Sequence, residues 1–221
     1  MEAVERALSV LEAFADGTPR LALADIAART GLYPSTILRL AGSLGRFGYL
    51  RRDEHGLFRL GPASLRLGAL YRQAFSLSDH VRPALRRLVT RTGETAAFYV
   101  REGESRICLY REPSPRPIRH HVEEGAALPL DRGASGHVLM AHTGGEGHRL
   151  DAVRARGLAV SLGERDPETA AVAAPIRGHG GTFLGALGVT GPRGRFEGAD
   201  LASIEEAVAE EARALSHALG G

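Results

Sequence analysis

Residues 33–47 read YPSTILRLAGSLGRF, and this stretch decides how the N-terminal part of the chain is interpreted. Apolar side chains recur at three- and four-residue steps, which is the spacing of one side of a helix, at Ile37, Leu40, Leu44 and Phe47. The opposite side holds hydroxyls and guanidiniums but no acid, at Thr36, Arg39, Ser43 and Arg46. The pattern predicts a helix that packs its apolar side on a small core and presents its polar side to a polyanion.

The residues on either side of this helix predict two more helices and a hairpin. An apolar stripe that stops at Asp16-Gly17 indicates the first helix, with Ala3, Ala7, Val10, Leu11 and Phe14. A shorter stripe that ends at Thr30-Gly31 indicates the second, with Leu23, Ile26 and Ala27. Extended runs at 49–52 and 57–60 flank a turn at 53–56. Three helices followed by a hairpin are typical of a winged helix-turn-helix.

Positive charge is concentrated in the same region. All 28 basic residues are arginine and the net charge of the chain is only +2, yet residues 29–72 hold eight arginines against two acids. Arg39 is placed to reach a guanine edge, and the hairpin to contact phosphate or the minor groove. The predicted DNA-binding residues are Ser35, Thr36, Arg39, Ser43, Arg46, Arg51, Arg52, His55 and Arg59. A helix-turn-helix that docks on a protein is the alternative.

The rest of the chain predicts an α+β domain of roughly 140 residues, which is an ordinary domain size. Helices are expected at 77–89, where Pro83 fits only a first turn, at 133–142 and at 201–219. Hairpins are expected at 95–111 and 170–190, and an extended segment at 118–122. The predicted organisation is a DNA-binding domain at 1–61, a linker helix at 62–76, with its helical pattern at 62–75, and a sensor-like domain at 77–221.

Two short motifs in the second half leave other chemistries open. His121 and Glu123 would point the same way from an extended strand and could share a metal ion, although two ligands do not make a site. Ser135 lies in a glycine-rich turn that fits the nucleophile-elbow pattern poorly, so lining a pocket is its expected role. A small-molecule enzyme that uses the N-terminal unit for dimerisation is therefore the competing function. We expect no cofactor and no catalytic residue, and a metal at His121 and Glu123 stays undecided.

Composition bears on the cellular setting. Cys108 is the only cysteine, so no disulfide can form within the chain, and a buried, inert thiol is expected. No stretch approaches the roughly 18 apolar residues of a membrane span, and the first residues lack the pattern of a secretory signal. These features predict a cytoplasmic protein without a membrane partner.

Several motifs in order resemble the IclR family of bacterial transcriptional regulators across nearly the whole chain. The N-terminal ones are AVERALSVLEAF, LALADIAARTGL and STILRLAGSLGRFGYL, and the C-terminal ones are GETAAFYV, GAALPLDRGASGHVLMA, LAVSLGERDPETAAVAAPI and LGALGVTGP. The resemblance implies a winged-helix DNA-binding domain, a linker helix and a GAF-like effector domain whose ligand alters repression or activation. It also implies dimers formed through the N-terminal part and often paired into tetramers, on a double-stranded operator.

The resemblance also implies an effector pocket. Carried over motif by motif, its lining would include Ala134, Ser135, Ser161, Ala171, Gly188 and Thr190. Many relatives carry an acid at Ser161, cysteine at Ala171 and serine at Gly188, so this chain is expected to offer fewer donors and more room. A larger or more apolar effector, such as an aromatic acid, is the resulting hypothesis. His137 and Asp131 also replace a lysine and a histidine that are common in the family.

Overall fold

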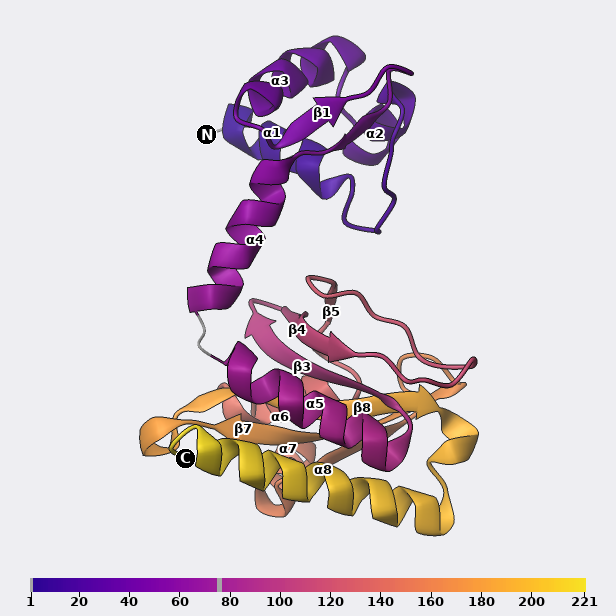
Figure 1. Ribbon diagram of the computed structural model, residues 1–221, viewed down its shortest axis with the longest axis vertical. Helices are drawn as coiled ribbons and strands as arrows, with labels where there is room; N and C mark the ends of the chain where they lie inside the picture. The colour runs from indigo at the N-terminus through magenta and orange to yellow at the C-terminus, as the bar shows by residue number, and fades with distance from the viewer. Residues whose placement is uncertain (1, 75–76) are drawn as a thin grey trace. The chain divides into compact units, whose positions relative to one another are not determined.

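The computed structural model describes residues 2–74 and 77–221, and the chain divides into two compact units, Met1–Phe75 and Ser76–Gly221. Each unit is described by itself (Figure 1). The predicted end of the linker helix at Phe75 and the predicted domain boundary at residue 76 lie outside the described residues.

The N-terminal unit is a winged helix-turn-helix followed by one more helix. Its elements are α1 (Glu2–Glu12), α2 (Leu23–Thr30), α3 (Pro34–Arg46), β1 (Leu50–Arg52), β2 (Phe58–Leu60) and α4 (Pro62–Ala74). As predicted, Gly31 ends α2 with a positive φ of 70° and Pro34 stands in the first turn of α3. The two strands form an antiparallel hairpin.

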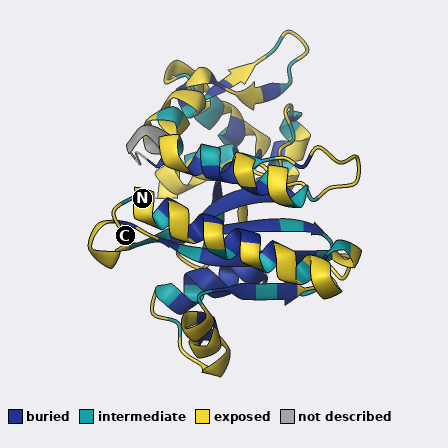
Figure 2. Cartoon of the chain, turned by 60° about the horizontal axis from the view of Figure 1, so that its bottom comes forward, coloured by how far each residue is buried: buried dark blue, intermediate teal, exposed yellow. Residues whose placement is uncertain are grey.

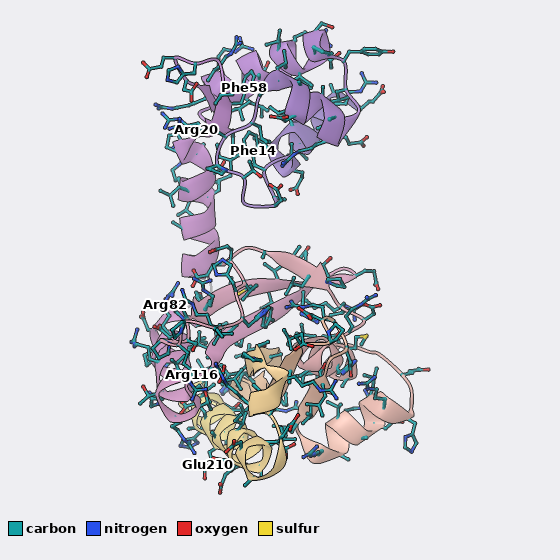
Figure 3. All side chains as sticks on the ribbon, turned by 90° about the vertical axis from the view of Figure 1, so that its right-hand side faces the viewer. Phe14, Arg20, Phe58, Arg82, Arg116 and Glu210 are labelled. Atoms are coloured by element: carbon teal, nitrogen blue, oxygen red, sulfur yellow. The ribbon has the colours of Figure 1, made fainter. Side chains whose placement is uncertain are left out.

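A small core holds this unit together. Phe14 and Phe58 are buried in it (Figure 3), with residues from all three of the first helices and from the hairpin, at Val10, Leu21, Ile26, Ile37 and Leu50. Because α3 places Ile37 at the centre of this core, its polar side faces away from the unit. The sequence pattern of residues 33–47 thus fixes which side of α3 is available to a partner.

The prediction that Phe47 belongs to the buried side of α3 is wrong. Its exposure is 73%, whereas Ile37 is fully buried. Ten residues of helix turn the chain by about 1000°, so Phe47 lies roughly 80° from Ile37, at the edge of the buried stripe. It also follows the last helical residue, Arg46, as the C-cap. Ala3, expected on the buried stripe of α1, is likewise exposed near the start of that helix.

The second unit is an α+β domain built on one antiparallel sheet with the strand order β5-β4-β3-β8-β7-β6. The strands are β3 (Thr95–Glu102), β4 (Ser105–Glu112), β5 (Ala127–Pro129), β6 (Ala159–Leu162), β7 (Thr169–Arg177) and β8 (Phe183–Pro192). The helices are α5 (Ser78–Thr92), α6 (Ala134–His142), α7 (His148–Arg156) and α8 (Gly198–Ala218), with short 3-10 turns η1 (His179–Gly181) and η2 (Arg193–Arg195).

Helices cover both faces of this sheet. The helices α5 and α8 pack on one face, where Leu88, Phe98 and Ile176 are fully buried. The helix α6 packs on the other face, beside α7, where Val138 and Leu139 are fully buried. Figure 2 shows the consequence, with buried strands between helices whose outer sides are exposed. The predicted fold class, a winged helix-turn-helix with a linker helix and an α+β, GAF-like domain, is confirmed.

Three details of the second unit differ from the sequence prediction. The segment 118–122, expected to be extended strand, forms no strand, because the proline-rich segment 113–117 precedes it and no neighbouring strand pairs with it. The short elements β5, α7 and β6 were not predicted. Pro83 lies in the second turn of α5 and not the first, and the ring leaves the carbonyl of the exposed Asp79 without its helical donor.

Candidate DNA-binding surface and effector pocket

The predicted DNA-binding residues all lie on α3 or on the hairpin that follows it. Thr36 and Ser43 are half-buried, and the others are exposed, at Ser35, Arg39, Arg46, Arg51, Arg52, His55 and Arg59. The helix contains no acid, and it packs against β1, so the helix and the hairpin belong to one basic surface. We call these nine residues the basic surface. Its helix and hairpin correspond to the recognition helix and the wing of a DNA-binding motif.

The arginines of the basic surface differ in whether they already bind other groups of the protein. Within the described residues, Arg39, Arg51 and Arg59 make no hydrogen bond and no ion pair. Arg51 and Arg59 are also direct cross-strand neighbours, and two like charges in that position repel each other unless an anion lies between them. These guanidiniums are available to phosphate or to base edges.

Two other members of the basic surface are partly engaged inside the unit. Arg52 donates from Nε to the carbonyl oxygen of Gly56 at 3.0 Å, and its guanidinium lies 5.3 Å from the ring centre of Phe58. Arg46 donates to the hydroxyl of Ser43 at 3.3 Å. Arg52 therefore helps to shape the turn of the wing as well as adding charge to it.

Within the described residues, the acids next to the wing form no ion pair with the arginines of the basic surface. Asp53 accepts hydrogen bonds from the backbone N–H groups of His55 and Leu57, and its other oxygen lies 3.7 Å from Arg20. Glu54 lies 3.7 Å from the ring of His55 and is exposed. The carboxylate of Asp53 thus closes the turn of the wing instead of pairing with an arginine of the predicted DNA contact.

A pocket opens in the second unit on the side of the sheet that α6 covers. It has about 360 Å³ of space between its atoms, including its mouth. Its lining comes from β3, β4, the start of α6, β6, β7, β8 and two loops, and comprises Tyr99, Arg106, His120, Gly133, Ala134, Ser135, Ser161, Arg165, Thr169, Ala170, Ala171 and Thr190. Five predicted effector residues are among them, namely Ala134, Ser135, Ser161, Ala171 and Thr190.

The sixth predicted effector residue, Gly188, does not line this pocket. A Cβ atom at that position would lie 2.4 Å from the carbonyl oxygen of Val172 and 2.9 Å from the Cβ of Ala173. At Gly188 the strands β7 and β8 therefore approach so closely that a side chain would not fit. The expectation that this glycine enlarges the pocket is wrong.

Charged residues of the pocket were missed by the sequence prediction. Arg106 is only 3% exposed, and burial lowers the pKa of its guanidinium from the usual value. Arg165 is half-buried, and its Nη2 lies 2.9 Å from Nε2 of His120. Burial, and then the charge of Arg165, lower the pKa of His120 to about 4, so this imidazole is neutral at pH 7. The two guanidiniums thus supply hydrogen-bond donors to the pocket that the sequence prediction did not include.

One sequence signal could have pointed to Arg106. It lies two residues before Cys108 in a strand, so both side chains share one face of the sheet, and Cys108 is fully buried. Nothing local indicates Arg165 or His120, because both stand in loops whose course depends on distant contacts.

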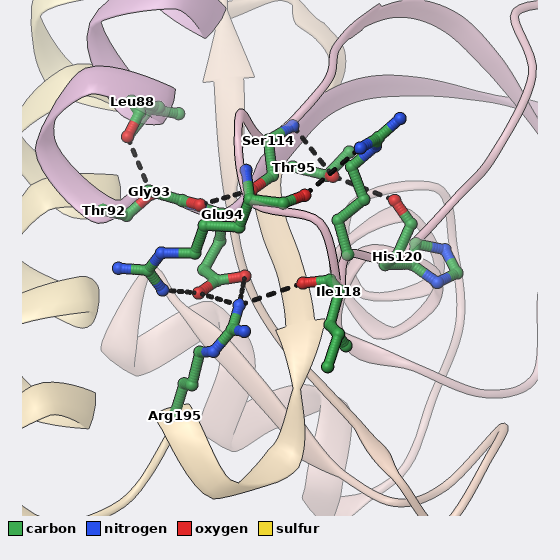
Figure 4. A network of polar contacts seen from close by, with 11 residues as sticks. Leu88, Thr92, Gly93, Glu94, Thr95, Ser114, Ile118, His120 and Arg195 are labelled. Atoms are coloured by element: carbon green, nitrogen blue, oxygen red, sulfur yellow. Dashed lines mark hydrogen bonds and ion pairs between the residues drawn. The ribbon is translucent and has the colours of Figure 1, made fainter.

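A buried carboxylate holds the loop that carries His120. Glu94 is 1% exposed, pairs with the guanidinium of Arg116 and lies 3.2 Å from that of Arg195. Arg195 also donates to the carbonyl oxygen of Ile118 at 3.2 Å (Figure 4). The hydroxyl of Thr95 donates to the carbonyl oxygen of His120 at 2.9 Å. We call residues 113–126 the pocket loop, and these contacts fix it beside the C-terminal end of α5.

The structure bears on the motifs for which the sequence left a metal site or an enzyme open. His121 and Glu123 do meet, at 2.5 Å, but residues 2–74 and 77–221 contain no cluster of three or more potential ligands that could hold a metal ion. Within the same residues, no hydrogen bond joins Ser135 to a histidine. Cys108 is buried, and burial raises the pKa of its thiol to about 12, so it is not a nucleophile. No described helix combines the length and the apolar character that a membrane crossing requires.

Comparisons with known proteins match both units. The IclR helix-turn-helix domain model matches residues 3–54, and the model of the C-terminal domain of bacterial IclR transcriptional regulators matches residues 70–148 and 147–217. The chain is 31% identical over 246 residues to the glycerol operon regulatory protein of Streptomyces griseus, covering 100% of this chain and 97% of that protein.

Solved structures share the same fold. An IclR transcriptional regulator from Alicyclobacillus acidocaldarius superimposes with a TM-score of 0.81 at 24% identity, covering 100% of this chain and 99% of that one. An IclR homologue from Microbacterium hydrocarbonoxydans, solved with 4-hydroxybenzoate, does so with a TM-score of 0.79 at 23% identity, covering 98% of each chain. The chain therefore belongs to the IclR family of bacterial transcriptional regulators, with an N-terminal helix-turn-helix domain and a C-terminal effector-binding domain.

Proposed function

We propose that this protein acts in the cytoplasm as a homodimer or tetramer, which binds a partly palindromic operator and answers to a small acidic effector. The observation that carries the proposal is the basic surface, where exposed Arg39, Arg51 and Arg59 have no intramolecular partner among the described residues. Arg39 would read a base edge, and the arginines of the hairpin would bind phosphate. The domain boundaries proposed for these roles are 1–61, 62–76 and 77–221.

Exposed apolar side chains on α1 and α4 support assembly through the N-terminal unit. They are Val4, Leu8, Leu65, Leu67 and Leu70, with exposures between 47% and 70%. A second copy that covers them would place two recognition helices on one duplex, and the symmetry of the pair would be repeated in the operator.

The pocket supports an acidic effector. Arg106 and Arg165 contribute positive charge to it, while Ser135, Ser161 and Thr190 contribute hydroxyls. An aromatic acid remains our hypothesis for the body of the molecule, supported by the fold-level likeness to the homologue solved with 4-hydroxybenzoate.

The response to the effector would be a population shift. An effector that binds better to one arrangement of the C-terminal domains biases the spacing of the paired winged helices. The helix α4 would transmit that bias as the linker between the units. In this proposal the effector is bound and released unchanged. The competing hypothesis, an enzyme that uses its N-terminal unit for dimerisation, gains no support from the comparisons.

A gel-shift titration tests the proposal. The full chain is mixed with the DNA that flanks its own gene and with unrelated DNA of equal length, at two salt concentrations. We expect specific binding that is about a thousandfold or more tighter than unspecific binding, with both weakening as salt rises because phosphate contacts release counterions. Equal binding to both DNAs, or none, would contradict the proposal.

A further inference from the structure

The pocket contains a buried positive charge that no carboxylate of the described residues pairs with. Arg106 is 3% exposed, and its Nε is buried without any hydrogen-bond partner among the described residues. Its Nη1 donates to the carbonyl oxygen of Arg132, and its guanidinium lies 5.7 Å from the ring centre of Tyr99. A buried guanidinium without a carboxylate partner is costly, so its presence here calls for an anion from outside the chain.

A second guanidinium that lines the same pocket also lacks a carboxylate partner within the described residues. Arg165 makes no ion pair with any acid in the described part of the chain, and its polar contact is the ring of His120. Because that ring is neutral at pH 7, it accepts a hydrogen bond from Arg165 but contributes no negative charge. The pocket therefore holds two positive charges.

The acids near the pocket are already engaged elsewhere. No Asp or Glu is among the lining residues, all of which lie in the described parts of the chain. Glu164 accepts a hydrogen bond from the backbone N–H of Gly133 at 3.0 Å and also pairs with Arg149 and with His137. Asp131 pairs with Arg132 at 2.9 Å. Both carboxylates attract Arg106 over a longer distance, but neither forms an ion pair with Arg106 or Arg165.

The remaining lining fits the oxygens of an anionic ligand. Hydroxyls come from four strands and one helix, at Tyr99, Ser135, Ser161, Thr169 and Thr190. Ala134 and Ser135 form the N-terminal end of α6, which carries a partial positive charge. The space of about 360 Å³ includes the open mouth and is therefore an upper limit, which favours a compact ligand over a nucleotide with several phosphates.

We propose that the effector is a compact dianion, either a dicarboxylate or a phosphate monoester, whose negative groups meet Arg106 and Arg165. The inference rests on the proposed function, because it takes this pocket to be the effector site. It adds to the expected aromatic acid a second negative charge, which the sequence pattern did not indicate. Dicarboxylates and phosphate monoesters share the chemistry that two guanidiniums recognise, and the ligands of the test separate them.

Calorimetric titration of the full chain with matched ligands tests the inference. Terephthalate is compared with benzoate, succinate with butyrate, and phenyl phosphate with benzoate, at pH 7.5. Each dianion is expected to bind about ten- to a hundredfold more tightly than its monoanionic partner, because a second charge-assisted contact is made. Preference for terephthalate or succinate identifies a dicarboxylate site, and preference for phenyl phosphate identifies a phosphate site.

Two pocket variants and one control test whether Arg106 and Arg165 bind the dianion. Arg165→Gln should reduce dianion binding to the level of the monoanion, whereas Arg156→Gln, on the exposed side of α7 and outside the pocket, should leave it unchanged. Arg106→Met should lose dianion binding while keeping or raising the melting temperature of the ligand-free protein, since a buried unpaired charge is removed. A fall in melting temperature on Arg106→Met would show a structural role and would contradict the inference.

The outcomes separate the inference from the proposed function. Equal affinity for dianions and monoanions, or binding of neutral analogues alone, would overturn the inference while specific operator binding left the function standing. If the protein bound dianions but no operator DNA, the inferred ligand class would be confirmed and the proposed regulatory function would be contradicted.

Discussion

Arg39 and Arg59 are both exposed and unpaired within the described residues, yet they stand in different parts of the basic surface. We expect Arg39→Ala, on the recognition helix, to weaken operator binding by about 1–3 kcal/mol and binding to unrelated DNA much less. Arg59→Ala, on the hairpin, should weaken binding to all sequences alike and reduce the salt slope by about one. Competition gel shifts measure both, and equal losses for Arg39→Ala on every DNA would contradict base reading.

The choice of Arg59 over Arg52 as the phosphate probe comes from the structure. The sequence prediction placed Arg52 with the other hairpin residues that contact phosphate or the minor groove. Because Arg52 also bonds to Gly56 and stacks on Phe58, its replacement would disturb the turn of the wing as well.

Gly188 offers a test of packing at a single residue. Gly188→Ser should lower the free energy of unfolding by about 1–3 kcal/mol, because the new Cβ would meet Val172 and Ala173 at less than 3.0 Å. Gly194→Ser is the matched control, since a Cβ there has no atom within 4 Å. Urea unfolding of both variants gives the answer, and equal stability would show that the strands can separate at Gly188.

His120 gives the pH dependence of stability a definite sign. Burial and Arg165 lower its pKa from 6.5 to about 4, so between these values the unfolded chain binds a proton that the folded chain does not. This contribution to stability is complete above pH 6.5 and is lost as the pH falls towards 4. We expect His120→Gln to reduce the loss of stability between pH 7 and pH 5, measured by urea unfolding. An unchanged loss would show that the imidazole is not held neutral in the folded protein.

At the scale of elements, the carboxylate of Glu94 is one of the groups that hold the pocket loop in place. Glu94→Gln should lower the free energy of unfolding by about 1–3 kcal/mol, less than for a fully buried pair because Arg116 and Arg195 keep contact with water. Amide exchange in residues 114–122 should become faster, and dianion affinity should fall as His120 loses its support. Glu210→Gln, which removes a surface pair with Arg91, should change stability by less than about 1 kcal/mol. Unchanged exchange in the loop would rule out this role for Glu94.

Helices and strands with a clear apolar pattern in the sequence were predictable. Elements that form only where a neighbouring segment pairs with them were not. The hairpin β7–β8 was predicted with nearly correct ends, because a glycine-rich turn separates two apolar runs. The helix α8 was found from its apolar spacing over 21 residues. By contrast, β5 has three residues and exists because β4 offers it an edge, while the segment 118–122 has strand composition but no partner.

At the scale of the whole molecule, the two units should respond to different ligands. Operator DNA should raise the unfolding temperature of unit Met1–Phe75, and terephthalate or phenyl phosphate that of unit Ser76–Gly221. A ligand at a hundred times its dissociation constant adds about 2.7 kcal/mol to the stability of the unit that binds it. Hydrogen exchange of amides in each unit, with and without each ligand, measures this. Protection by the dianion confined to the N-terminal unit would contradict the assignment of the pocket.

The sequence by itself determined the order of helices and hairpins, the acid-free side of α3 and the family, because each of these depends on residues close together in the chain. Only the tertiary structure decided what the pocket is. Arg106 and Arg165 are far apart in sequence and come together because of the strand order and because α6 and the pocket loop cover that face of the sheet. The exposure of Phe47 and the tight packing at Gly188 were decided in the same way. Burial and the lack of a paired carboxylate at Arg106 depend on which distant segments lie nearby, and local periodicity carries no information about that.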